Sequence, residues 1–163
     1  MKSVMRNGAK ACLLAAVALA LGVGGYEPAQ ATTGGSPYEV PQVVNISGDA
    51  NTVETYIVAS EAAVDIGNGV KANAMTFKSC AANNGACDAQ VGTIPGPEFR
   101  LKVGDHVIVH YVNKLPSNVL NSVEANVSAI HWHGIELNNA SDGTEVTQAA
   151  VAPAGGTFEY DFI

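Results

Sequence analysis

Two histidines, His131 and His133, flank the only tryptophan of the chain, Trp132, within the apolar stretch "AIHWHGIEL". In an extended strand the side chains of residues i and i+2 point to the same face, about 6.6 Å apart. Imidazole is a common ligand of transition metals, so the pair could hold one ion or serve two neighbouring ions. The alternative is a pair of ordinary strand-end histidines that bond to carbonyl groups. The spacing therefore marks a candidate metal site.

The remaining two histidines, His106 and His110, lie four residues apart in "HVIVHYVN". On a strand this spacing separates their side chains by about 13 Å, which is too far for one ion. We expect them to be solvated or partly packed residues of a strand.

The elements that must position these histidines are predicted to be short strands. No convincing amphipathic helix appears, and β-branched or aromatic runs alternate with Gly, Asn and Pro. The strand candidates are 53–60, 70–77, 98–103, 106–113, 127–135 and 156–163, and the turn candidates are 66–69, 83–85, 94–97, 103–105, 113–118 and 138–143. This pattern predicts an all-β fold, a sandwich or a barrel.

Residues 1–31 have the organisation of an export signal, with a basic start, an apolar run over 11–25 and "AQA" over 29–31. We expect cleavage after "AQA" and a periplasmic or extracellular protein; the alternative is an uncleaved anchor. Residues 32–41 read as a flexible leader, and 42–163 as one domain. The formal net charge of −7 disfavours nucleic acid and, after cleavage, anionic membrane as partners.

Two cysteines, Cys80 and Cys87, remain once the export signal is removed. The Asn-Asn-Gly between them can form the turn of a short loop, and an exported protein meets an oxidising compartment. We expect a disulfide. The alternative, a pair of metal ligands, lacks a nearby CxxC or histidine.

The order of the motifs resembles the first cupredoxin (plastocyanin-like) domain of the multicopper oxidases, which include laccases, ascorbate oxidase and bacterial cuprous oxidases. The resemblance covers roughly residues 53–163, and "HWHG" followed by "DG" and "VTQ" is its most specific part. The stretches that carry it are "IPGP", "FRLKVGDHVIVHYVNKLP", "IHWHGIEL", "SDGTEVTQ" and "VAPAGGTFEYDF". It implies a Greek-key β-sandwich and copper as cofactor.

The resemblance also implies roles for individual residues. His131 looks like a ligand of the type 2 copper, and His133 like a ligand of one ion of the type 3 pair. Asp142 corresponds to a nearby carboxylate that assists proton delivery, unless it is a plain Asp-Gly turn. Gly134 is expected to allow close backbone approach. Such enzymes couple one-electron oxidation of a small reducing substrate to four-electron reduction of O2 to water.

The sequence departs from the family at several points. The three-copper cluster draws on eight histidines from four motifs, and this chain has one of the four. The HxxHxH and HCHxxxH motifs are absent, and Ala149 and Ala150 stand where many relatives have Cys-Pro. We therefore expect an N-terminal piece whose sandwich is incomplete at its C-terminus: a truncated gene model, a relic, or part of a split enzyme. Without the remaining cupredoxin domains we expect it to be inactive.

Two other functions stay open. An exported cupredoxin module could carry or buffer copper through His131 and His133 without catalysis. A cupin-type metalloenzyme is the weaker alternative, because the interval between the pair and Glu136 is short and Ala125 replaces the expected glycine.

Overall fold

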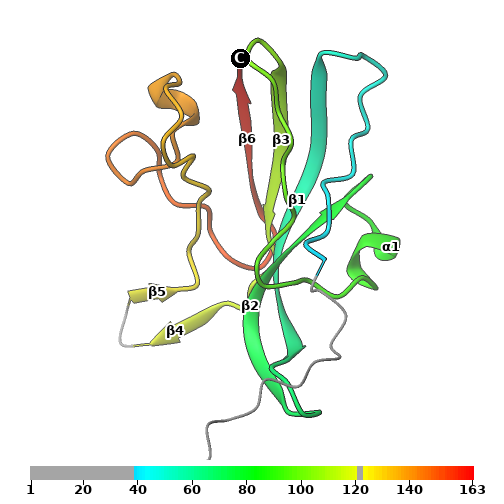
Figure 1. The fold of residues 1–163 in the computed structure, drawn as a ribbon. Coiled ribbons are helices and arrows are strands. Elements are labelled where there is room, and N and C mark those ends of the chain that lie inside the picture. The colour runs from blue at the N-terminus through cyan, green and yellow to red at the C-terminus, as the bar shows by residue number, and fades with distance from the viewer. Residues whose placement is uncertain (1–38, 121–122) are drawn as a thin grey trace, which may run out of the picture. The chain divides into compact units, whose positions relative to one another are not determined.

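The computed structural model describes residues 39–120 and 123–163 (Figure 1). The predicted export signal, 1–31, and most of the leader, 32–41, lie outside the described residues. In the described part of the chain, no helix is long and apolar enough to cross a membrane.

A four-stranded sheet with the order β2-β1-β3-β6 forms the centre of the fold. Its strands are β1 (Thr52–Asp65), β2 (Lys71–Cys80), β3 (His106–Asn113) and β6 (Gly156–Phe162). β1 pairs antiparallel with β2 and parallel with β3, and β6 pairs antiparallel with β3. The smaller elements are the ribbon β4 (Asn118–Leu120) and β5 (Val123–Ala125), the single helical turn α1 (Gly85–Asp88) and the 3-10 turn η1 (Asn139–Ser141). The predicted all-β class is confirmed.

Four of the six predicted strands are present, and two predictions are wrong. Residues 98–103 and 127–135 contain no regular strand; each joins another segment through a single isolated bridge, Gln42↔Glu98 and Ser128↔Val151. Both segments pack apolar side chains against the sheet, and alternating burial gives them the period of a strand. That pattern reports which side chains are buried, and it does not require backbone pairing.

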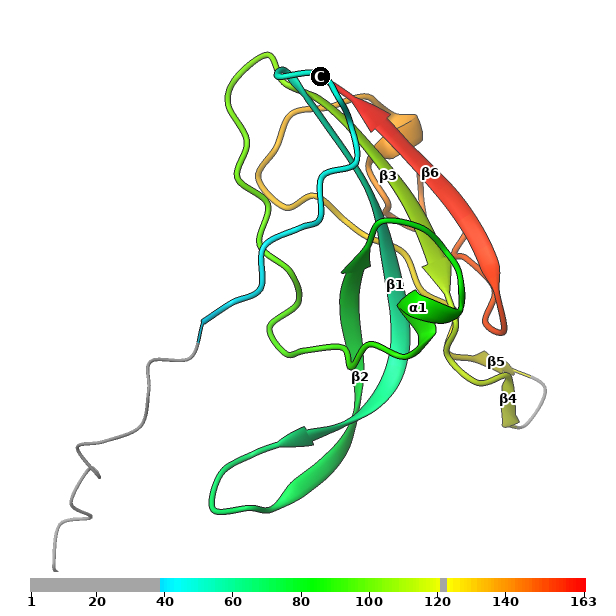
Figure 2. The ribbon, with the colours of Figure 1, turned by 90° about the vertical axis from the view of Figure 1, so that its right-hand side faces the viewer.

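Segment 126–155 lies against one face of the sheet and α1 against the other (Figures 1 and 2). The larger apolar core fills the space between this segment and the sheet. Its buried members are Ile57, Ala59, Val107, Val109, Tyr111, Leu115, Trp132, Val151, Tyr160 and Phe162. A smaller core of Val58, Cys80, Cys87 and Val112 lies under α1. The larger core therefore lies on the side of the sheet that faces the His131–His133 segment, and the smaller core lies on the side that carries the cysteines.

A disulfide joins Cys80 to Cys87, with an S–S distance of 2.04 Å and a Cα–Cα distance of 5.6 Å. Asn84 begins α1 by accepting from the backbone N–H groups of residues 86 and 87. Lys78 is buried beside the Cys80–Cys87 loop, and its ammonium group donates to the backbone carbonyls of Asp88 and Gln90 at 3.3 and 2.9 Å. Burial lowers the pKa of Lys78, although the Asp88 carboxylate opposes the shift. The disulfide loop from Cys80 to Cys87 therefore has a structural role, because it packs in the smaller core.

Candidate metal centre

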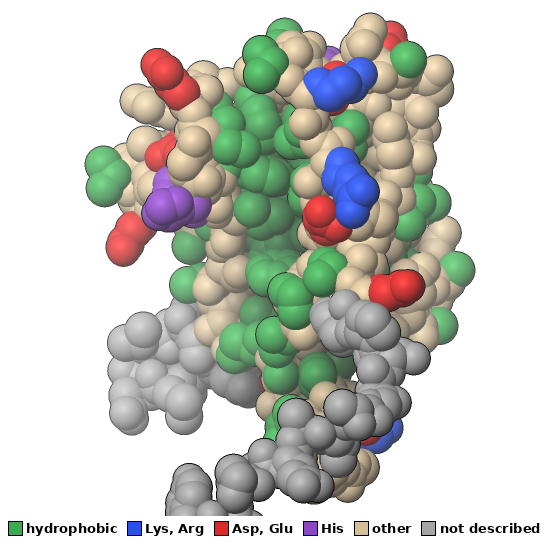
Figure 3. Space-filling view, in the orientation of Figure 1, with side chains coloured by type: hydrophobic (Ala, Val, Ile, Leu, Met, Phe, Trp, Pro, Cys, Tyr) green, Lys and Arg blue, Asp and Glu red, His purple; other side chains and the backbone are tan. Residues whose placement is uncertain are grey.

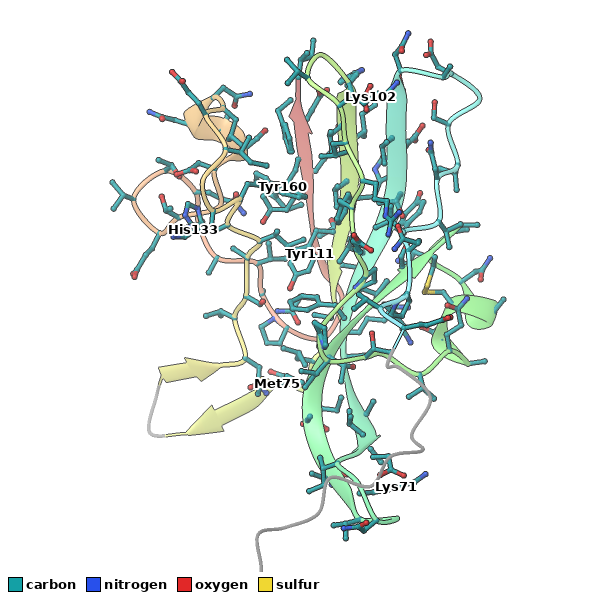
Figure 4. The ribbon with its side chains drawn as sticks, in the orientation of Figure 1. Lys71, Met75, Lys102, Tyr111, His133 and Tyr160 are labelled. Carbon is teal, nitrogen blue, oxygen red and sulfur yellow. A yellow bond between two sulfur atoms is a disulfide. The ribbon has the colours of Figure 1, made fainter. Side chains whose placement is uncertain are left out.

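The His131–His133 segment is irregular, yet it keeps the alternation of a strand. Trp132 is 8% exposed and points into the core, whereas both histidines are exposed on the other side. Their ring centroids are 5.9 Å apart with an interplanar angle of 79°. Figure 4 shows His133 on the segment that covers one face of the sheet. The expectation that the two imidazoles share a side holds without a strand.

Trp132 anchors the pair in an aromatic cage. Its ring makes edge contacts with Phe99, Tyr160 and Phe162, at centroid distances of 5.4, 5.8 and 5.0 Å. Such contacts are worth about 0.5–1.5 kcal/mol each beyond simple burial. The cage fixes the middle of the HWH tripeptide and thereby directs both imidazoles outward.

The residue before the pair is held by a buried tyrosine of β6. The Ile130 N–H donates to the Tyr160 hydroxyl oxygen at 2.7 Å, and Gln148 Nε2 donates to the same oxygen at 3.2 Å. Tyr160 is fully buried, and burial raises the pKa of its hydroxyl above the usual tyrosine value. The hydroxyl therefore stays protonated at neutral pH and acts as a fixed acceptor for the backbone.

The His131 ring is oriented by Asp142. His131 Nδ1 lies 2.8 Å from the Asp142 carbonyl oxygen and 3.4 Å from its carboxylate Oδ1. A carbonyl only accepts, so Nδ1 must carry the proton and donate it. In the neutral ring this places the lone pair on Nε2, the arrangement of a metal-ligating histidine whose other nitrogen is held by the protein.

The Asp-Gly turn can reach His131 only because Gly143 has no side chain. Gly143 has a φ of +75°, and a Cβ there would lie 1.7 Å from the Ile130 carbonyl oxygen. Gly134 also has a positive φ, +81°, but a Cβ there would meet nothing within 4 Å. The expectation of close approach at Gly134 is therefore wrong: its role is the left-handed turn, and the close approach belongs to Gly143.

His106 and His110 lie on β3, and both bond to carboxylates. His106 Nε2 is 2.6 Å from Asp161, while His110 lies between Glu54 at Nε2, 2.9 Å away, and Glu159 at Nδ1, 3.1 Å away. Both are partly exposed strand residues, as expected from the sequence. Every ring nitrogen of His110 is already engaged.

The donors at His131 and His133 fit copper, since imidazole suits this metal. Among residues 39–120 and 123–163, no group of three or more His, Cys, Asp or Glu is arranged to hold an ion. Cys80 and Cys87 bond to each other in the smaller core under α1, away from the histidine pair. The structure thus brings together His131, His133 and Asp142, and the two histidines are candidate nitrogen donors.

The sequence profile of the multicopper oxidases matches residues 82–163, which contain all three of these residues. This chain belongs to the multicopper oxidase family. The family binds copper, which confirms the predicted cofactor. The chain is 51% identical over 74 residues to Laccase-1 of Botryotinia fuckeliana, and 43% identical over 70 residues to multicopper oxidase MmcO of Mycobacterium tuberculosis. These alignments cover 44% and 43% of this chain and 12% of each relative.

The fold is also similar to a solved multicopper oxidase from Campylobacter jejuni, described as a metallo-oxidase. The TM-score is 0.55 at 22% identity, and the match covers 76% of this chain and 21% of that protein. This similarity confirms the cupredoxin fold class.

Sequence reasoning missed Tyr160 and Gln148 as residues that support the site. One signal was available: "FEYDF" alternates so that Phe158, Tyr160 and Phe162 share the inward face, and a buried tyrosine hydroxyl needs a partner. The sequence could not name that partner, because it is a backbone N–H 30 residues away.

Proposed function

We propose that this chain is a copper-binding cupredoxin domain of an exported multicopper oxidase, with His131 as a ligand of the type 2 copper and His133 as a ligand of one type 3 copper. Family membership and the position of the pair within the matched region support this proposal. The remaining ligands would come from further cupredoxin domains of the same oxidase. Residues 1–31 would direct export.

The observation that carries the proposal is the way in which the His131 ring is held. Its Nδ1 is held by the Asp142 carbonyl at 2.8 Å, and no hydrogen bond within the described residues engages Nε2. A ligand held in this way loses little rotational freedom when it binds a metal. The side chain is 46% exposed, so the free nitrogen is accessible to a copper site shared with other domains.

The copper that these residues would help to hold would supply the redox chemistry, the transfer of electrons from a small reducing substrate to O2. The chain itself would contribute orientation and a proton-holding group. The Asp142 carboxylate is 26% exposed and 3.4 Å from His131, where it could hold a proton next to the cluster. The backbone carbonyl of the same residue fixes the ring, so one residue would serve both purposes.

Copper titration of the full chain, followed by EPR, tests the ligand assignment. We expect His131→Ala with His133→Ala to weaken Cu²⁺ binding at the specific site by at least about tenfold, the usual cost of disturbing a metal site. The matched control is His106→Ala with His110→Ala, which removes as many imidazoles and should leave the signal unchanged.

Equal loss in the two double variants would refute the assignment. Tight stoichiometric binding by the wild-type chain alone would instead favour the copper-buffering module over an oxidase domain, because two imidazoles of a shared cluster should bind the ion weakly.

A further inference from the structure

We propose that Tyr160, with Gln148 as its partner, is a positioning residue that sets the direction of the His131 imidazole. The positioning itself concerns the chain's own atoms, and only its consequence for copper rests on the proposed function. Tyr160 is fully buried on β6 and touches no metal ligand directly through its hydroxyl.

The His131 segment needs such a residue because it is not part of the sheet. Within the described residues, its one β-bridge joins Ser128 to Val151 through two backbone hydrogen bonds, of 3.1 and 2.8 Å. Beyond Ser128 the backbone of 129–133 has no strand partner within the described residues. Contacts from side chains must therefore fix the backbone from which His131 projects.

Tyr160 acts on this backbone at two points. Its hydroxyl oxygen accepts from the N–H of Ile130, directly before His131, and its ring packs against Trp132, directly after it. The strand that carries Tyr160 is paired along its length with β3, with Val109 opposite Tyr160. A paired strand is a more rigid base for a site than a loop. One side chain thus ties both neighbours of His131 to the sheet.

Gln148 completes the arrangement from a third segment. It is 9% exposed, and its Nε2 donates to the second acceptor position of the Tyr160 hydroxyl at 3.2 Å. Figure 4 shows Tyr160 between the sheet and the segment that carries His133. The hydroxyl therefore joins "VTQ", "IHWHG" and "FEYDF", three stretches that are far apart in the sequence.

Tyr160 could instead be an ordinary core residue whose hydroxyl only adds stability. The two roles can be separated, because Tyr160→Phe removes the hydroxyl and keeps the ring that contacts Trp132. Tyr111→Phe is the matched control: Tyr111 is equally buried, lies 6.3 Å from Tyr160 between ring centroids, and makes no hydrogen bond to Ile130.

The first measurement needs no metal. In the full chain, NMR would follow hydrogen exchange of the Ile130 amide and the ¹⁵N signals of the His131 ring. We expect wild type to hold His131 as the Nδ1–H tautomer and to protect the Ile130 amide. Tyr160→Phe should increase Ile130 exchange by at least about tenfold and mix the tautomers, whereas Tyr111→Phe, which removes a hydroxyl with no hydrogen bond among the described residues, should do neither.

The second measurement is Cu²⁺ affinity, where Tyr160→Phe should weaken binding by about tenfold, within the range seen when residues behind metal ligands are removed. Retained Ile130 protection and a single His131 tautomer in Tyr160→Phe would overturn the inference. If the His131 ring is disordered in Tyr160→Phe and the Cu²⁺ affinity is unchanged, the inferred effect of Tyr160 on copper binding is wrong. If copper binds without His131 and His133, the proposed function fails, and the metal-free measurement still decides whether Tyr160 positions the ring.

Discussion

The two histidine pairs of this chain have similar sequence surroundings and very different surroundings in the structure. His106 and His110 lie on a regular strand, where carboxylate side chains of neighbouring strands bond their ring nitrogens. His131 and His133 lie on an irregular segment, where a backbone carbonyl holds one nitrogen of His131 and leaves the other free. Figure 3 shows histidine on the left of this face, to one side of a central band of hydrophobic side chains.

The difference teaches that regular structure is not what holds a histidine ring while one of its nitrogens has no hydrogen-bond partner among the described residues. The strand pair lies on regular backbone, but Nε2 of His106 and both ring nitrogens of His110 already contact carboxylates. The irregular pair is ordered by the packing of Trp132 and by the Asp142 carbonyl, and Nε2 of His131 has no hydrogen bond among the described residues. The supporting contacts, more than the spacing of the histidines, distinguish the candidate ligands from the structural pair.

Gly143→Ala should have the largest effect, because it disrupts the close approach of the Asp142–Gly143 turn to the backbone before His131. The new Cβ would overlap the Ile130 carbonyl, and the φ of +75° would be strained as well. We expect the free energy of unfolding to fall by about 3 kcal/mol or more. Urea denaturation measures the loss. The control is Gly134→Ala, which has a similar φ and open space, and should cost about 1 kcal/mol; similar losses in both would disprove the role of close approach.

Asp142→Ala should have a smaller effect, because it leaves the carbonyl that holds His131 in place. We expect Cu²⁺ affinity to change by less than about fivefold, the scale of one partly exposed charge. Titration with EPR detection gives the affinity, and Asp142→Asn separates the loss of charge from the loss of shape. A large loss in both variants would show that the carboxylate, rather than the backbone, orients the ring.

Glu54→Gln with Glu159→Gln should have the smallest effect of all. These variants remove the charges beside His110, and exposed pairs of this kind contribute at most about 1 kcal/mol each. We expect a slightly lower unfolding midpoint and no change in copper binding. If the variant gains a tight copper site at His110, the carboxylates alone account for the difference in copper binding between the two histidine pairs.

The sequence predicted the shared side of His131 and His133, since alternation around a buried tryptophan holds with or without a strand. It also predicted the cysteine pairing, because Cys80 and Cys87 are joined by a local turn. The irregular backbone of 127–135 was not predictable, since the same alternation arises from packing onto a sheet.

The contribution of Tyr160 was not predictable either, because it depends on a contact with the distant Ile130. The sequence could not show whether the backbone carbonyl or the carboxylate of Asp142 lies closer to Nδ1 of His131, since both belong to one residue and only the turn geometry decides this.

The strand order has a consequence for how the ligand segment is assembled in time. The central pairings join Thr52 to His106 and Val107 to Phe162, so the chain has a high contact order, and such topologies fold in milliseconds to seconds. β6 follows the histidine pair in the chain, so during synthesis the HWH tripeptide emerges before Tyr160 and Phe162 exist to hold it. The contacts that hold the HWH tripeptide can therefore form only after β6 has been added to the sheet.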